Sequence, residues 1–279
     1  MEHVHWASRP PLDRPVVIAA FEGWNDAGDA ATAAARWLRD RWATEPLAEI
    51  DAEEFFDFTS TRPRVSITDE ESREIEWPAN ALTFGTAAGI DAVVLVGTEP
   101  QLRWRTFCRQ VVDVAQALDS RLVLTLGALL AEVPHTRPTS VVGTADDQAL
   151  IEGMHLTRST YQGPTGIVGV LSDACARADL LAASLWAAVP AYVPGASSPK
   201  AALALVERIA DLLAVPIVAT DLEIAAAYYE RQVSEVVADD EEMTDYVAQL
   251  EQRYDSDEGV PTGSLVEEVE RFLREGPSE

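Results

Sequence analysis

Three short stretches of the sequence gather residue types that can bind or transform a ligand. Their members are Glu22, Asn25, Asp26 and Asp29 in the first stretch, Glu99, Arg103 and Arg105 in the second, and Glu132, His135 and Arg137 in the third. Paired carboxylates serve as ligands of hard cations or as general acid and base, and arginines recognise carboxylate and phosphate groups. The same residue types also form internal networks of ion pairs, so a ligand pocket and a structural network are both open interpretations.

Each of the three stretches follows a run of apolar residues. The runs cover residues 16–21, 92–96 and 122–126, and each predicts a buried strand. In α/β proteins, ligands bind in the loops beyond the carboxyl ends of parallel strands. If these strands are parallel and adjacent, their polar loops meet at one edge of the sheet.

Asp26 and Asp29 lie at the predicted junction between a strand and an alanine-rich helix over residues 30–42. They could hold a cation or act as a base and its orienting group. A simpler interpretation makes Asp26 the N-cap and places Asp29 in the first turn, where both carboxylates complement free N–H groups and the helix dipole. We favour capping.

The other two stretches carry similar alternatives. Glu99 forms either part of a pocket or an ion pair with Arg103 or Arg105 that fixes the start of a helix. His135, in a loop with prolines on both sides, is more typical of a packed loop residue than of a catalyst. No second histidine or cysteine stands at ligand spacing, so we expect no metal site and no cofactor.

The glycine-rich segment 161–169 precedes another predicted helix. It matches neither the dinucleotide-binding fingerprint nor a phosphate-binding P-loop, so turn geometry and close helix packing account for it better. The sequence also has no nucleophile elbow of the Gly-x-Ser-x-Gly type. Cys108 falls on the apolar stripe of a predicted helix, which indicates a buried structural thiol.

The alternation of short strands and helices predicts an α/β fold with a mostly parallel central sheet flanked by helices. We expect an N-terminal arm (1–15), an α/β domain (16–219) and an acidic helical C-terminal appendage (220–279). Residues 65–77 predict a hairpin, and the appendage predicts three helices, the last over residues 265–273. Residues 230–279 hold 16 acidic and 4 basic side chains.

The overall charge limits the partners. The 279 residues carry a formal net charge of −26, which disfavours binding to nucleic acid and to anionic membrane surfaces. The apolar runs are too short to span a membrane, and the N-terminus lacks the layout of a signal peptide. We therefore expect a cytoplasmic protein.

Five segments in register resemble the proteasome assembly chaperone 2 family, and most closely its uncharacterised actinobacterial branch. They are EGWNDAGDA (22–30), GTEPQLRW (97–104), PHTRP (134–138), YQGPTG (161–166) and SPKAAL (198–203). The resemblance implies an α/β fold related to the nucleoside phosphorylase core and assembly into homo-oligomers, for which we guess a trimer. It also implies members that bind proteasome subunits rather than catalyse a reaction.

The sequence departs from this family in two places. It ends in Gly-Pro-Ser-Glu instead of a hydrophobic-Tyr-any tripeptide, so docking through such a tail is not expected. It has Pro190-Ala191-Tyr192 where many relatives have Pro-His-Tyr. The leading hypothesis is a non-enzymatic interaction protein or assembly chaperone, with proteasome subunits or another protein as partner. The alternative is a phosphorylase- or hydrolase-like enzyme, or a ligand sensor, that uses a cleft at the sheet edge.

Overall fold

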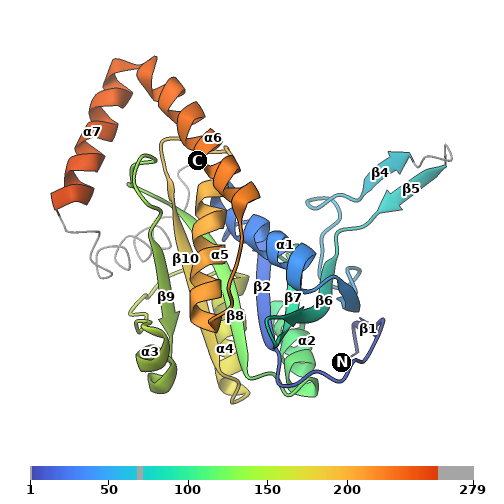
Figure 1. Ribbon diagram of the computed structural model, residues 1–279. Helices are drawn as coiled ribbons and strands as arrows, with labels where there is room; N and C mark the ends of the chain where they lie inside the picture. Colours follow the sequence, from blue (N-terminus) through green and yellow to red (C-terminus); the bar gives the residue numbers. More distant parts are fainter. Residues whose placement is uncertain (1, 68–71, 257–279) are drawn as a thin grey trace.

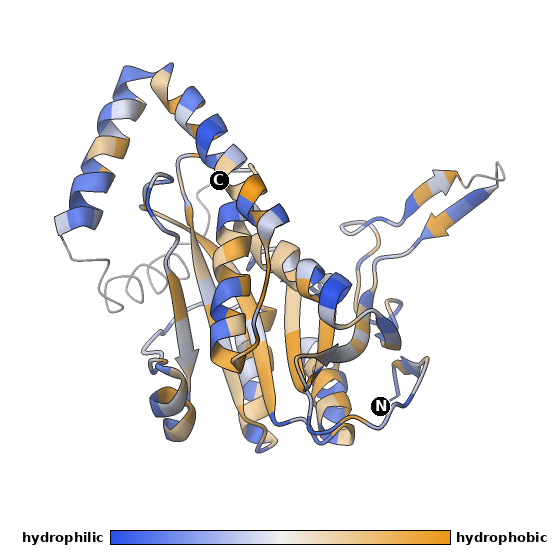
Figure 2. Ribbon diagram, in the orientation of Figure 1, coloured by the Kyte–Doolittle hydropathy of each residue, from blue (hydrophilic) through white to orange (hydrophobic). Residues whose placement is uncertain are grey.

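The centre of the protein is a parallel sheet of four strands. The computed structural model describes residues 2–67 and 72–256. The four strands, in spatial order, are β7 (Ile90–Thr98), β2 (Val16–Glu22), β8 (Leu122–Ala131) and β10 (Ala182–Pro190). Figure 2 shows these strands as the most apolar part of the ribbon, as expected for strands covered on both faces. The three apolar runs at residues 16–21, 92–96 and 122–126 lie in neighbouring parallel strands, as predicted.

Antiparallel strands extend the sheet at both edges. On one side β6 (Asn80–Ala87), β3 (Glu45–Ile50) and β1 (Val4–Trp6) follow β7, and on the other side β9 (Val141–Ala145) pairs with β10. Because β1 pairs with β3 from Val4 to Trp6, part of the expected N-terminal arm is a strand of the main sheet.

Helices cover both faces of the sheet (Figure 1). One face packs against α1 (Ala30–Trp42) and α5 (Pro199–Leu213), and the other against α2 (Trp104–Ala117) and α4 (Ile167–Arg177). Each interface is a continuous apolar core, so the prediction of an α/β fold with a sheet between helices is confirmed. Cys108 of α2 is fully buried, and this burial raises the pKa of its thiol to about 12, so the thiol stays protonated.

The C-terminal part of the described chain is a pair of helices. α6 (Thr220–Ala238) packs against α5, and α7 (Glu241–Ser256) turns back beside α6 (Figure 1). Tyr229, Val233 and Val247 form a small apolar cluster of their own between them. The predicted third helix, residues 265–273, lies outside the described residues. The division into arm, α/β domain and appendage stays a prediction.

Two smaller elements complete the fold. α3 (Gln148–Met154) follows β9, and the predicted hairpin is present as β4 (Arg64–Ile67) and β5 (Arg73–Glu76). Figure 1 shows this hairpin projecting away from the sheet and its helices. Within residues 2–67 and 72–256, no helix is long and apolar enough to cross a bilayer.

Candidate functional site

The loops after β2 and β7 meet at the carboxyl end of the sheet. The backbone N–H of Glu99 donates to the carbonyl oxygen of Glu22 at 2.8 Å. The N–H of Ala128 in β8 donates to the carbonyl oxygen of Asn25, also at 2.8 Å. The first two predicted stretches are therefore neighbours, because the strands that precede them are neighbours.

Asp26 caps α1 from just outside the helix. Its buried Oδ1 accepts the backbone N–H groups of Ala31 at 2.8 Å and Thr32 at 3.1 Å, and the Thr32 hydroxyl donates to Oδ2. Burial raises the pKa of Asp26, while these hydrogen bonds oppose that rise because they favour the charged form. The carboxylate is thus occupied by the helix start that it stabilises.

Asp29 has a different role from the one expected. It precedes α1 with φ at 52°, and its side chain makes no hydrogen bond to the helix N-terminus. Its Oδ2 instead accepts the hydroxyl of Ser197, at 2.7 Å, in the loop before α5. Beside it, Gly28 has φ at 58°, and a Cβ there would lie 3.0 Å from the side chain of Ser198, so this contact between the two loops requires glycine.

Glu99 holds the start of α4. Its Oε1 accepts the backbone N–H of Ile167 at 2.8 Å, and its Oε2 accepts the N–H of Trp24 at 3.4 Å. The expected ion pair of Glu99 with Arg103 or Arg105 is not among its contacts. Arg103 instead pairs with Glu54. The sequence could not indicate the bond to Ile167, because the two residues are 68 positions apart.

The remaining members of the first two stretches are spread over different contacts. Glu22 pairs with Arg36 of α1, and Arg105 lines a groove between α2 and α4. Asn25 is 3% exposed, and its Oδ1 has no hydrogen-bond partner in the described part of the chain. Arg105 therefore does not join Glu22 and Asp26 in one cluster.

His135 lies in a separate network that connects the third loop to α6. The backbone N–H of His135 donates to the Tyr192 hydroxyl at 2.8 Å, and that hydroxyl lies 2.7 Å from His135 Nδ1. His135 Nε2 lies 2.9 Å from Ser234 Oγ, whose hydroxyl donates to the carbonyl oxygen of Glu230. A neutral imidazole with its proton on Nε2 satisfies every bond in this chain. Burial, and next the charge of Lys200, lower the pKa of His135 and so favour that neutral form.

Arg137 connects the same loop to α7. Its guanidinium forms two hydrogen bonds to the Asp255 carboxylate, at 2.9 and 2.8 Å, and pairs with Glu251 at 3.3 Å. Glu132 pairs with Arg253 of α7 at 3.2 Å. These contacts hold α7 against the loop after β8.

The predicted residues therefore form two groups and not a single cluster. Asp26, Asp29 and Glu99 hold helix starts and loops at the ends of β2 and β7, whereas His135 and Arg137 face α6 and α7. A hollow of about 470 Å³ beside the first group is lined by Glu22, Glu99 and Trp104. No group of three or more His, Cys, Asp or Glu side chains in the described residues is arranged to hold a metal ion.

Sequence reasoning missed most of the partners that fix these side chains. Tyr192, Ser234 and Glu230 lie 57, 99 and 95 positions from His135, and they come from two other elements. Lys200, the only lysine of the chain, donates to the carbonyl oxygen of His135 at 2.5 Å and pairs with Glu230. That Lys200 is the single lysine of the sequence was the only feature that set it apart, and this feature does not indicate its bond to His135.

The relation to known proteins follows from a family model and from solved structures. The model of the PAC2 family matches residues 20–237, which include all ten residues of the three stretches. This chain belongs to the PAC2 family. The predicted resemblance to proteasome assembly chaperone 2 proteins is therefore confirmed. No curated protein is similar enough to this chain to count as a match.

Two solved PAC2 relatives come from actinobacteria. A PAC2 family protein from Streptomyces avermitilis is 42% identical, with a TM-score of 0.77, over 84% of this chain and 99% of that one. A proteasome-assembly chaperone homologue from Mycobacterium tuberculosis is 44% identical, with a TM-score of 0.75, over 83% and 99%. They support placing the chain in the actinobacterial branch.

An archaeal homologue of proteasome-assembly chaperones, from Pyrococcus furiosus, is 16% identical with a TM-score of 0.60, over 90% of this chain and 99% of that one. At this identity the likeness concerns the fold alone.

Proposed function

We propose that this PAC2 protein is a non-enzymatic interaction protein of the assembly-chaperone kind. It binds other proteins, including copies of itself, through apolar surfaces. The description of the 44% identical mycobacterial relative as a proteasome-assembly chaperone homologue supports this proposal. The surface feature that carries it is the projecting β4–β5 hairpin.

The hairpin presents an apolar face that its own fold leaves more than half exposed, although Trp77 packs edge-on against Phe58. Val65, Ile67, Ile75 and Trp77 are 53, 74, 55 and 54% exposed. Val65 lies opposite Ile75, and side chains two positions apart on a strand share a face, so all four belong to one side of the ribbon. A two-stranded hairpin is marginally stable alone, and clustered exposed apolar side chains are typical of binding surfaces. Contact with a partner would stabilise it.

A second apolar surface lies on α6. Ile224, Tyr228 and Val236 are 66, 51 and 65% exposed, and their spacing of four and eight residues places them along one helix face. The hairpin and this stripe lie on different parts of the molecule (Figure 1). Contact between the hairpin of one copy and α6 of the next would be heterologous, and such contacts form a ring when the rotation between copies closes. A homotrimer is the ring that we propose.

The charge favours certain partners. A net charge of −26 repels nucleic acid and favours proteins with basic surfaces, which it also steers during association. We propose proteasome subunits or another cytoplasmic protein as the physiological partner.

One observation favours the alternative of a ligand-binding or enzymatic role. The hollow lined by Glu22, Glu99 and Trp104 lies at the carboxyl ends of β2 and β7, where α/β proteins bind ligands. The arginines expected as anion anchors there, Arg103, Arg105 and Arg137, do not line it. A binding assay with nucleosides and inorganic phosphate tests this alternative.

Site-specific cross-linking tests the protein-binding role. A photoreactive amino acid at position 67, on the apolar face, is compared with the same amino acid at position 66, on the opposite face of β4. We expect position 67 to link covalently to specific proteins, identified by mass spectrometry, with this chain among them. Position 66 should give little product. Equal yields at both positions, together with turnover of a nucleoside, would reject the proposal.

A further inference from the structure

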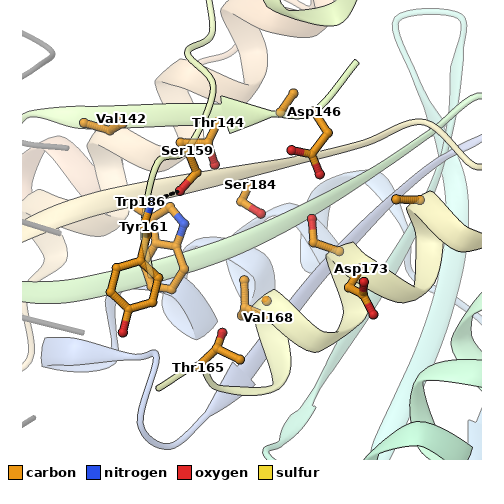
Figure 3. A pocket seen from close by; sticks show the side chains of 14 residues that line it. Val142, Thr144, Asp146, Ser159, Tyr161, Thr165, Val168, Asp173, Ser184 and Trp186 are labelled. Atoms are coloured by element: carbon orange, nitrogen blue, oxygen red, sulfur yellow. Dashed lines mark hydrogen bonds between the residues drawn. The ribbon is translucent and has the colours of Figure 1, made fainter. Parts of the chain in front are cut away.

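We propose that a cavity between α4, β9 and β10 binds a small neutral polyol of sugar size. The cavity has a volume of about 250 Å³ (Figure 3). It shares no lining residue with the hollow at the carboxyl ends of β2 and β7. Its lining includes Tyr161, Thr165, Val168 and Gly169 of the glycine-rich segment 161–169.

Among residues 2–67 and 72–256, the main helix contacts of β9 are with α3 and α5, and the cavity lies beside β9 on the α4 side of the sheet. The chain after α3 runs beside β9, and the N–H of Thr157 donates to the carbonyl oxygen of Gly143 in β9 at 2.9 Å. Further along this segment, the Tyr161 hydroxyl donates to the carbonyl oxygen of Pro164 at 2.5 Å and closes a turn. Ser159, Tyr161 and Thr165 line the cavity from this side, so the segment forms a polar wall opposite the sheet.

Trp186 provides a hydrogen-bond donor at the wall of the cavity. The residue is 8% exposed, and its indole N–H bonds to no described residue but is not among the fully buried unpaired atoms, so it remains accessible from the cavity. Figure 3 shows the nitrogen edge of the indole turned toward the cavity. The ring lies against Gly127 of β8, where a Cβ would be 2.4 Å from the ring, so glycine is required for this placement. The indole N–H can only donate, so an oxygen of a molecule in the cavity is a suitable acceptor for it.

A hydroxyl pair on the sheet adds a second polar group. Ser184 of β10 lines the cavity, and its Oγ lies 2.7 Å from Oγ1 of Thr125, its register partner in β8. Both residues are buried, at 1% and 6% exposure for Thr125 and Ser184. One hydrogen bond does not use the full capacity of two hydroxyls, so this pair can also bond to a molecule in the cavity.

The charged residues of the lining decide the class of ligand. Asp146 and Asp173 lie at the cavity, and its described lining includes no lysine, arginine or histidine. Asp173 is paired with Arg177 of α4 at 3.0 Å, whereas Asp146 has no ion-pair partner among the described residues. The Asp146 carboxylate therefore repels phosphorylated or carboxylated molecules, and both carboxylates can accept hydrogen bonds from hydroxyl groups. An indole donor, several hydroxyls and two acceptors together match a molecule with many hydroxyl groups and no negative charge.

Binding of D-ribose, D-glucose and myo-inositol to the full-length protein tests the proposal, by calorimetry and ligand-observed NMR. D-ribose 5-phosphate is the anionic comparison. We expect saturable binding of at least one polyol and weaker binding of the phosphate. Trp186→Phe keeps the ring and removes the donor, so affinity should fall roughly three- to tenfold, the value of one hydrogen bond.

Trp42→Phe is the matched control. Trp42 is also 8% exposed, but it lies in the core on the opposite face of the sheet. The control should bind with wild-type affinity, and Asp146→Asn, at an exposed position of the cavity lining, should weaken binding without affecting folding. Absence of saturable binding for all three polyols, or equal affinity of the Trp186→Phe and Trp42→Phe proteins, would overturn the proposal.

Discussion

The carboxyl end of the sheet and the β4–β5 hairpin use their side chains in opposite ways. At the sheet end, Asp26 and Glu99 accept backbone N–H groups of α1 and α4, so their charges serve the fold itself. On the hairpin, Ile67 and Trp77 expose more than half of their surface and contribute little to the core. Carboxylates whose type and spacing suggest catalysis or ligand binding can therefore be structural. Large apolar side chains that the fold leaves exposed are better indicators of function.

The largest effect on stability is expected from Asp26. Asp26→Ala removes the acceptor of two backbone N–H groups and of the Thr32 hydroxyl, all of them buried. We expect the free energy of unfolding to fall by about 2 kcal/mol, measured by urea denaturation. Asp29→Ala, at an exposed residue three positions away, should cost less than about 1 kcal/mol. Equal losses would show that Asp26 is not the cap that holds α1.

Glu99 should give a smaller loss. Glu99→Ala frees the N–H of Ile167 at the start of α4, and we expect a cost of about 1 kcal/mol in urea denaturation. Glu54→Ala, which removes the exposed partner of Arg103, should change stability by less than about 0.5 kcal/mol. If Glu99→Ala proved neutral and also abolished the binding of a small molecule, the alternative function would gain support.

The His135 network predicts a dependence of stability on pH. The folded-state pKa of His135 lies below 6.5, because burial disfavours the imidazolium. As the pH falls below 6.5, the unfolded chain takes up a proton that the folded chain does not, so the free energy of unfolding decreases until the folded pKa is reached. Urea denaturation between pH 7 and pH 5 measures this slope.

Two variants separate His135 from other groups that titrate. His135→Gln removes the titrating imidazole and should flatten the slope of stability against pH. It should also lower stability at pH 7, because it disrupts the bonds to Tyr192 and Ser234. His155→Gln, the same substitution at an exposed histidine, is the control. A slope that persists in His135→Gln would show that other groups cause it.

The smallest effect on stability is expected on the hairpin. Ile67→Asp and Ser66→Asp each add one negative charge to β4, on opposite faces. Because Ile67 is 74% exposed, both variants should change the free energy of unfolding by less than about 0.5 kcal/mol. If Ile67→Asp greatly lowered the free energy of unfolding of the monomer, the apolar face would have to pack within its own chain.

Sequence patterns predicted the part of the fold that is buried on both faces. Residues 16–21 and 92–96 are uninterrupted apolar runs, and they became β2 and β7. No strand was predicted at β3, where Glu45, Pro46 and Glu49 interrupt the pattern, because antiparallel strands near an edge need only one buried face. β3 pairs with β1 and β6, which are distant from it in sequence, so local patterns could not assign the place of β3 in the sheet.

The candidate site was predictable only where its bonds are local. Asp26 caps a helix that begins four residues later, and capping was the favoured interpretation from the sequence. Glu99 bonds to Ile167, 68 positions away, and His135 to Ser234, 99 positions away. These partners depend on how the helices pack on the sheet. Trp186 gave no signal, because an unpartnered indole N–H can be identified only in three dimensions.

The mass of the full-length protein in solution tests the central claim most directly. Light scattering at micromolar concentration should give a multiple of the 30.3 kDa chain for the wild type and for Ser66→Asp, and a lower mass for Ile67→Asp. A 30.3 kDa particle for the wild-type protein, or the same multiple for both variants, would contradict the claim that the hairpin's apolar face binds a protein partner.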